Sequence, residues 1–324
     1  MKGNLKERKG ITLIALVVTI IILLILAGVT IYFAVNSGLI EKTQEAKNKS
    51  EQATQNELNT LNEIYGELNR YLPNEETVEN ISKTESYVGY YADINADGTV
   101  DGIIYADLAV GGSGTWNSNS WSSYEYSQVT EGLKSYYVSS DSYTGFGDNW
   151  TKPVLTAIEG SGTKDRFYVM ALEDFNPGTS YCWYAAAVGK LDNTISSSTN
   201  DFGQGKTNTT TMIAEWNKGE NGKYGPQDDR DMWGVIQKAD NAGKTWDLNK
   251  WFVPSKAEWA TFGDMAFTKM EVTAGNCGDY GLKGYYWSSA QSGTNNAYSA
   301  FFGVGSMGNY DVYDNNSVRL SATF

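Results

Sequence analysis

The sequence predicts an α+β protein in which a long N-terminal helix is followed by a head of mixed strands and helices. The first observation is an uncharged, proline-free run from Ile11 to about Val35, whose roughly 25 apolar residues exceed the about 20 that a helix needs to cross a bilayer. The second is a strong helix-start signal at Ser255, and the third is the alternation of apolar and polar residues toward position 324.

The N-terminal run is predicted to be a transmembrane helix. Lys2, Lys6, Arg8 and Lys9 precede it, and this excess of positive charge keeps the start of the chain cytoplasmic. A cleaved secretory signal is a poorer interpretation, because the apolar run is too long and no small-residue cleavage site follows it. The expected localisation is therefore a single-pass protein of the cell membrane with an extracellular head.

Gly10 stands between the basic leader and the apolar helix, and this arrangement resembles the type IV prepilin signature. The resemblance implies that a prepilin peptidase cleaves after Gly10, removing residues 1–10, and that the new N-terminus at Ile11 is methylated. It also implies packing against other pilin subunits through the helix. Ala15 occupies the position where filament-forming pilins usually carry glutamate, which favours a minor pilin at a pilus tip.

The helix is predicted to continue as a stalk, so that one transmembrane and stalk helix covers residues 11–72. Leu58, Leu61, Ile64 and Leu68 recur at three- and four-residue steps within the segment 39–72. Proline at position 73 ends the pattern.

The composition restricts partners and chemistry. The formal net charge is −13, and cleavage of a leader that sums to +3 leaves −16, so the protein repels nucleic acid. The chain contains no histidine, which excludes Ser-His-Asp and Cys-His catalysis and most zinc and haem sites.

The remaining reactive side chains do not predict an enzyme. Cys182 and Cys277 are either bonded to each other or two independent thiols, because their spacing requires neither. Asp228, Asp229 and Asp231 stand ahead of a predicted helix, where a run of acids is usually a solvated N-terminal turn. We expect no catalytic residues.

Residues 73–164 are predicted to form the β-rich N-terminal part of the head, with two strands around an oxygen-rich loop. The loop places candidate metal ligands at Asp93, Asn95, Asp97 and Asp101. This spacing suits calcium, and the loop resembles calcium loops in hairpins of integrin-type propellers, although Ile104 replaces the bidentate glutamate of an EF-hand. The alternative is a tight Asn/Asp/Gly turn that needs no metal.

Further elements follow from local pattern. The Gly/Ser-rich stretch 111–123 is predicted to be a loop or connection. Segments 166–172 and 181–184 resemble strands, and segments 211–216 and 230–238 resemble helices. Ser255 and Glu258 form a capping box behind a proline, so a helix is predicted from residue 255 to about residue 267.

Three motifs in order carry a second resemblance: WFVPSKAEW at 251–259, GYYWSSAQ at 284–291 and SVRLSATF at 317–324. They resemble bacterial surface domains with a C-type-lectin-like fold, related in shape to formylglycine-generating enzymes. More narrowly, they resemble the variable proteins of diversity-generating retroelements, which mutate template adenines. The resemblance covers about 165–324 and implies a ligand-binding head with a variable region at 284–324, without catalysis.

The composition of the variable region agrees with adenine-directed change. Between Lys283 and Arg319 only Trp287, Gln291 and Met307 fall outside the residues reachable from asparagine codons ending in a pyrimidine. An ordinary Asn/Gly/Tyr-rich β-loop region is the alternative.

Strand alternation assigns the faces of this region. In the strand predicted over 298–303, Tyr298, Ala300 and Phe302 are expected to face the core, and the residues between them the solvent. The segment 306–316 is expected to be exposed. Four residues of the last strand are expected to face inward, namely Val318, Leu320, Ala322 and Phe324, and Trp251 and Trp287 are expected in the core. The predicted ligand-binding residues are Ser292, Asn296, Ser299, Phe301, Gly303, Ser306, Asn309, Tyr310, Asp311, Tyr313 and Asn315.

The sequence thus predicts a surface-displayed, pilin-like protein that binds an unknown protein or glycan, as a minor or tip pilin adhesin would. The alternatives are a structural pilin-like subunit, or a membrane-anchored surface protein without a dedicated ligand. The expected partners are the prepilin peptidase, other pilin subunits, the membrane and the ligand, but not nucleic acid.

Overall fold

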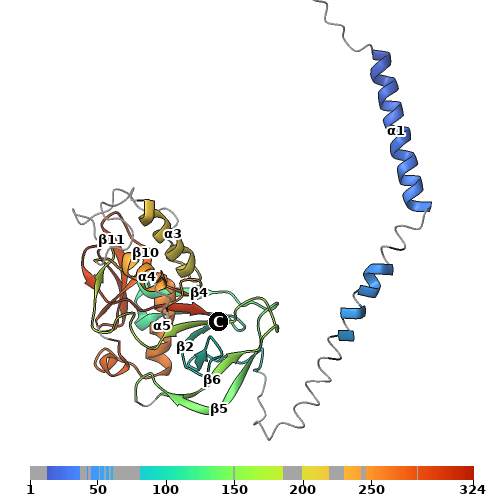
Figure 1. Cartoon of the computed structure of the whole chain (residues 1–324). Coiled ribbons are helices and arrows are strands. Elements are labelled where there is room, and N and C mark those ends of the chain that lie inside the picture. Colours follow the sequence, from blue (N-terminus) through green and yellow to red (C-terminus); the bar gives the residue numbers. More distant parts are fainter. Residues whose placement is uncertain are drawn as a thin grey trace, which may run out of the picture. The chain divides into compact units, whose positions relative to one another are not determined.

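The computed structural model describes residues 13–36, helical residues scattered between 42 and 60, and residues 81–148, 150–184, 199–218, 230–241, 246–282 and 284–324. The chain divides into two compact units, Met1–Glu75 and Glu76–Phe324. Figure 1 shows both, coloured along the sequence.

In the first unit, helix α1 runs from Leu13 to Asn36. Its described side chains, at residues 16–30 and at Tyr32, are all exposed. Among the described residues, no helix combines the length and the apolar character needed to cross a membrane. The predictions of a long transmembrane helix and of a single-pass cell-membrane protein are therefore wrong.

The processing site at Gly10 and Ile11 lies outside the described residues. Most of the stalk predicted over 39–72 also lies outside them, and the described residues between 42 and 60 are helical.

The second unit is built on a seven-stranded sheet with the strand order β5-β6-β1-β2-β7-β14-β9. Strands β1 and β6 are parallel, and the other neighbours are antiparallel. Residues from both sides of position 165 therefore share one sheet. The strands are β5 (Tyr136–Thr144), β6 (Thr151–Ala157), β1 (Tyr91–Asp93), β2 (Gly102–Asp107), β7 (Phe167–Ala171), β14 (Ser321–Thr323) and β9 (Trp251–Phe252).

Three smaller sheets complete the strands. The C-terminal sheet consists of β10 (Tyr285–Gln291), β11 (Asn296–Phe301) and β12 (Ser306–Asp311), all antiparallel. Strand β8 (Tyr181–Cys182) pairs with β13 (Asn315–Asn316). Strands β3 (Gly112–Thr115) and β4 (Ser123–Tyr126) form a hairpin through two short turns, η1 (Trp116–Ser118) and η2 (Ser120–Ser122).

The β3–β4 hairpin corrects the prediction of a loop over 111–123. Gly112 pairs with Tyr126 and Gly114 with Tyr124. The two glycines are thus the cross-strand partners of two tyrosines. The prediction of a loop failed because it used only the Gly/Ser-rich composition, which does not show strand pairing.

Helix α5 (Lys256–Lys269) confirms the predicted helix start. The Ser255 hydroxyl accepts from the Glu258 backbone N–H at 3.2 Å, and the Glu258 carboxylate accepts from the Ser255 N–H at 2.7 Å. Helices α3 (Gly205–Lys218) and α4 (Met232–Asn241) confirm the two other helical predictions, and a short turn η3 spans Cys277–Tyr280.

Helix α5 lies in the centre of the head, between the large sheet and the C-terminal sheet (Figure 1). The Phe262 ring lies 6.0 Å from Tyr105 of β2, and the Trp259 ring lies 5.2 Å from Tyr286 of β10. Nine residues of the helix between Ala257 and Ala266 are buried, so it is covered around most of its circumference.

The predicted core residues are confirmed, with the exception of Tyr298, which is only half-buried. Trp251, Trp287 and Phe302 are buried. The alternation of the last strand also holds, since Val318, Leu320, Ala322 and Phe324 are all buried.

Candidate functional site

The C-terminal sheet distributes the predicted ligand-binding residues over two faces. The register pairs Phe301 with Ser306 and Asn296 with Asp311. Because side chains alternate along a strand, residues 301 and 296 of β11 point to opposite sides. The predicted set is thus two groups rather than one continuous surface.

The first group is an aromatic cluster, which we define as Tyr285, Phe301 and Tyr310, one residue from each strand. The rings of Tyr285 and Phe301 stack at 4.0 Å with an interplanar angle of 18°, and the Tyr310 ring meets Tyr285 edge-on at 4.7 Å. All three side chains are half-buried. Such contacts hold the rings rigidly while part of each remains accessible.

Glycine at position 308 gives Tyr310 room to lean toward the other two rings. A Cβ atom at Gly308 would lie 3.1 Å from the Tyr310 ring. Burial, and then the hydrogen bond with Tyr285, raises the pKa of Tyr310 to about 12. Tyr310 is therefore uncharged over the physiological pH range.

The second group is a polar edge, which we define as Asn296, Asp311 and Tyr313. The two carboxylate oxygens of Asp311 accept from the Asn296 amide at 3.1 Å and from the Tyr313 hydroxyl at 3.1 Å. This hydrogen bond raises the pKa of Tyr313. The Tyr313 side chain is 51% exposed.

The remaining predicted residues differ in accessibility. Asn309 and Asn315 are exposed, and Gly303 and Ser306 are half-buried. The hydroxyl oxygen of Ser292 is buried, although the residue as a whole is not. A ligand at the surface would therefore not reach that hydroxyl without a rearrangement.

The exposure predicted for Ser299 is wrong. Its side chain is fully buried, and its hydroxyl donates to the Tyr286 carbonyl at 2.9 Å. Simple alternation fails because the middle of β11 is covered on both faces. On the opposite face, Tyr298 is half-buried rather than in the core, with the Lys256 ammonium 4.8 Å from its ring centroid.

The segment 306–316, predicted to be exposed, is mostly sheet. It contributes β12 and β13, and both Met307 and Val312 are buried. Exposure within it is confined to Asn309 and to the turn at residues 313–315.

In the loop predicted to hold calcium, the carboxylates accept hydrogen bonds from backbone N–H groups of the same loop. Asp93 accepts from the N–H groups of residues 97 and 98, and Asp101 accepts from that of residue 94. The oxygen of Asn95 accepts from Lys250. Within the described segments, no three His, Cys, Asp or Glu side chains gather as metal ligands would. Burial, and then the charges of Asp93 and Asp97, raises the pKa of Asp101.

Cys182 and Cys277 are both buried and are not joined by a disulfide, which decides between the two alternatives. Asp231 is buried and accepts from the Gly234 N–H at 2.7 Å, as a residue capping the start of α4 does. Asp228 and Asp229 lie outside the described residues.

Sequence reasoning missed Tyr285. Its position in the motif at 284–291 suggested only a structural role. Its place in the aromatic cluster depends on pairing with Phe301, which lies sixteen residues further along the chain and directly opposite it in the sheet. The available signal was an aromatic residue in each of two neighbouring segments, the motif at 284–291 and the strand predicted over 298–303.

The second unit is thus a mixed helix-and-sheet domain with an aromatic cluster at one end of its C-terminal sheet. No family model and no curated protein matches the chain. One solved structure, a fimbrial protein from Bacteroides ovatus ATCC 8483, is similar at 14% identity and a TM-score of 0.32. The match covers 49% of this chain and only 36% of that chain, and a likeness at this level carries no argument about fold or function.

Proposed function

We propose that this chain is a pilin-like surface protein that binds a macromolecular ligand through the aromatic cluster and the polar edge. The observation that carries the proposal is the half-buried cluster of Tyr285, Phe301 and Tyr310 on three adjacent strands. The prepilin-like Gly10 supports the pilin-like part, and the resemblance of residues 165–324 to variable lectin-like proteins supports the binding part.

The chemistry of these residues suits a protein or glycan surface. Tyrosine and phenylalanine give a large contact area at a low cost in conformational entropy, and binding energy in interfaces concentrates in a few such anchors. Asp311 adds a negative charge at the polar edge, and Asn309 adds an exposed amide. A partner with apolar and hydrogen-bonding groups in one surface would match both groups.

The sequence pattern supports a surface that tolerates change. Substitutions at Asn309 or Tyr313 leave the buried middle of the sheet intact, because Ser299, Met307 and Val312 carry the packing. This division is what a diversified binding surface requires.

The test is capture of ligands from protein and glycan arrays by the labelled full-length chain. Phe301→Ala and Tyr310→Ala should each weaken capture by about 1–3 kcal/mol. Tyr137→Ala is the matched control, because Tyr137 lies on β5 and is 38% exposed. Capture that is equal in the cluster variants and the control would contradict the proposed binding surface.

The pilin-like part has a separate test. N-terminal sequencing of the protein from its native cells should find Ile11 as the first residue, because Gly10 precedes it as in prepilins. An intact Met1 would contradict the proposal that the chain is pilin-like. The proposed binding surface would then still be tested separately by the arrays.

A further inference from the structure

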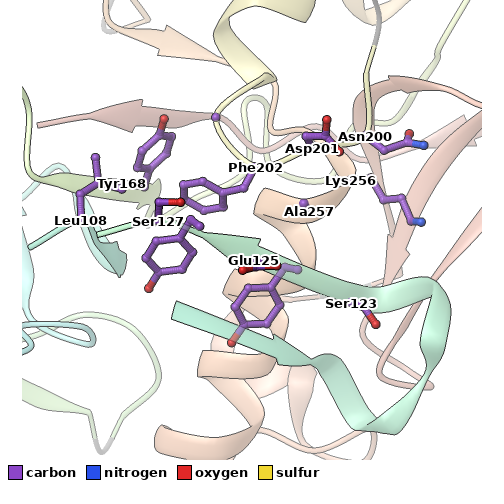
Figure 2. A pocket seen from close by; sticks show the side chains of 13 residues that line it. Leu108, Ser123, Glu125, Ser127, Tyr168, Asn200, Asp201, Phe202, Lys256 and Ala257 are labelled. Carbon is purple, nitrogen blue, oxygen red and sulfur yellow. The ribbon is translucent and has the colours of Figure 1, made fainter. Parts of the chain in front are cut away.

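A pocket of about 650 Å³ opens beside the β3–β4 hairpin, and none of the predicted ligand-binding residues lines it. The five consecutive residues 123–127, which include the whole of β4, line one side. Residues 200–203 and the first turn of α5 line the other side, and Figure 2 shows Asp201 and Lys256 across the pocket from Ser123. Because a strand rises about 3.3 Å per residue, the pocket follows β4 for roughly 13 Å. It is therefore a groove that runs along the strand.

The groove lies along the free edge of β4. Strand β3 is the only neighbour of β4 in their two-stranded sheet, and no residue of β3 lines the groove. In an antiparallel pair, alternate residues direct their N–H and C=O groups to the partner, and the others direct theirs outward. Apart from the pairing with β3, residues 123–127 make no backbone–backbone hydrogen bond with any described residue. The outward groups of β4 are thus available to another strand.

The inner face of β4 carries two tyrosine rings, which form the aromatic wall of the pocket. The Tyr124 hydroxyl donates to the Asp264 carboxylate of α5 at 2.6 Å, so this face is turned toward the helix. Glycines of β3 leave room for the rings. A Cβ atom at Gly112 would come within 2.6 Å of Tyr126, and one at Gly114 within 2.7 Å of Tyr124.

The outer face of β4 carries one charge. Because side chains alternate along a strand, Ser123, Glu125 and Ser127 point away from the face of the tyrosines, and all three are exposed. A residue of an added strand directly opposite Glu125 would therefore have its side chain beside that carboxylate.

This charge opposes pairing between two copies of the chain. The sequence of residues 123–127 is the same in both directions, so antiparallel pairing of two β4 strands in full overlap would set Glu125 opposite Glu125 of the second copy. Like charges directly opposite each other are destabilising, whereas opposite charges stabilise a strand pair. The formal net charge of −13 also attracts a basic partner. The charges thus favour a basic peptide over a second copy.

We propose that the free edge of β4 binds an extended peptide, which adds a third strand to the hairpin and carries an arginine or lysine opposite Glu125. The peptide backbone pairs with the outward N–H and C=O groups of β4, as in strand addition to other sheet edges. The residues on either side of the cation lie on the same face as the tyrosines. Apolar side chains suit that face, where the Phe202 ring already stacks on Tyr126 at 4.5 Å. The site is independent of the binding surface proposed above.

The test is binding of end-blocked heptapeptides to the full-length chain, measured by fluorescence anisotropy. The peptides alternate apolar residues with threonine around a central arginine, and a matched set carries glutamate at the centre. The arginine peptides should bind about tenfold more tightly than their glutamate counterparts, and Glu125→Lys should reverse this preference. Glu131→Lys changes an exposed acid outside the groove and should leave the preference as it is.

A second measurement separates strand addition from other modes of binding. N-methylation of alternate residues of the arginine peptide removes the donors of one peptide edge. One methylation pattern should therefore abolish binding, and the complementary pattern should preserve it. Bound peptide should also slow hydrogen exchange at residues 123–127, because the outward N–H groups become hydrogen-bonded.

Three results would overturn the proposal: no arginine peptide binds, the two methylation patterns act alike, or Glu125→Lys still prefers arginine. Protection of residues 123–127 by self-association, without peptide, would identify a second copy as the occupant and would also overturn it. Phe301→Ala should bind the arginine peptides as the parent chain does. This variant therefore separates the groove from the aromatic cluster of the C-terminal sheet.

Discussion

The aromatic cluster of the C-terminal sheet and the aromatic wall of the pocket share one local arrangement, a tyrosine ring packed over a glycine. They differ in the residues that surround them. In both, a glycine lets a tyrosine ring lie flat: Gly308 under Tyr310, and Gly114 opposite Tyr124. The cluster lies at the end of a sheet, whereas the wall lies in a hollow whose lining includes the carboxylates of Glu125 and Asp201. The ring arrangement is thus set locally, and the kind of ligand is set by the neighbouring elements.

The largest effect should separate two adjacent phenylalanines. Phe302→Ala removes a fully buried ring that contacts Trp116, Trp259 and Phe262, and it should cost about 3–5 kcal/mol of unfolding free energy. Phe301→Ala removes a half-buried ring and should cost about 1 kcal/mol. Chemical denaturation of both variants measures the difference. Equal losses would mean that the cluster is core rather than surface.

The free energy of unfolding of the head should depend on pH through Glu258. Burial raises the pKa of Glu258 to about 7, although N–H groups of Gly203 and Gly205, beside the pocket, donate to its carboxylate. Since the pKa in the folded state is raised, this contribution to stability is complete below about pH 4.5 and is lost as the pH rises through about 7.

The size of this effect is about 3 kcal/mol, from a shift between pKa 4.5 and about 7. It should appear as the difference between the parent chain and Glu258→Gln in denaturation curves measured from pH 4 to pH 8. The same pH slope in both proteins would show that Glu258 keeps an ordinary pKa.

A smaller effect is expected at the polar turn between β1 and β2. Asp93→Ala leaves two backbone N–H groups without their acceptor and should cost about 1–3 kcal/mol. If the loop binds calcium, a chelator should lower the melting temperature of the parent chain but not that of Asp97→Ala, since a ligand bound only to the folded state stabilises it. No shift in either protein would favour the bare turn.

The smallest effect should come from Gly308→Ala. The new Cβ would lie 3.1 Å from the movable edge of the Tyr310 ring, so the ring can shift by a few tenths of an ångström. Stability should change by less than about 1 kcal/mol, while the near-ultraviolet circular dichroism of the tyrosines should change. An unaltered spectrum would indicate that Gly308 does not position the cluster.

Local signals in the sequence predicted structure well, and pairings between distant segments were not predictable. The capping box at Ser255 needs only residues within one helical turn, and the alternation from Val318 to Phe324 needs only one strand. Ser299 was misassigned because the second layer over β11 comes from elsewhere in the chain.

The same reasoning explains the two aromatic sites. Phe301 and Tyr310 were predicted to bind the ligand, but the role of Tyr285 emerged only from the register of the sheet. The pocket could not be predicted from the sequence, because Tyr124, Phe202 and Lys256 come from three separate segments. In addition, the glycines of the hairpin resembled those of a flexible connection.

The position of β14 has a consequence for how the head is made. Residues 321–323 insert between β7 and β9, and β9 lies at the edge of the sheet. Because the ribosome releases residues in order, β7 and β9 are synthesised before β14. The edges of both strands that pair with β14 stay unpaired until it emerges. A chain arrested before residue 321 therefore exposes the buried edge of β7, and such an unpaired edge can pair with another chain and aggregate.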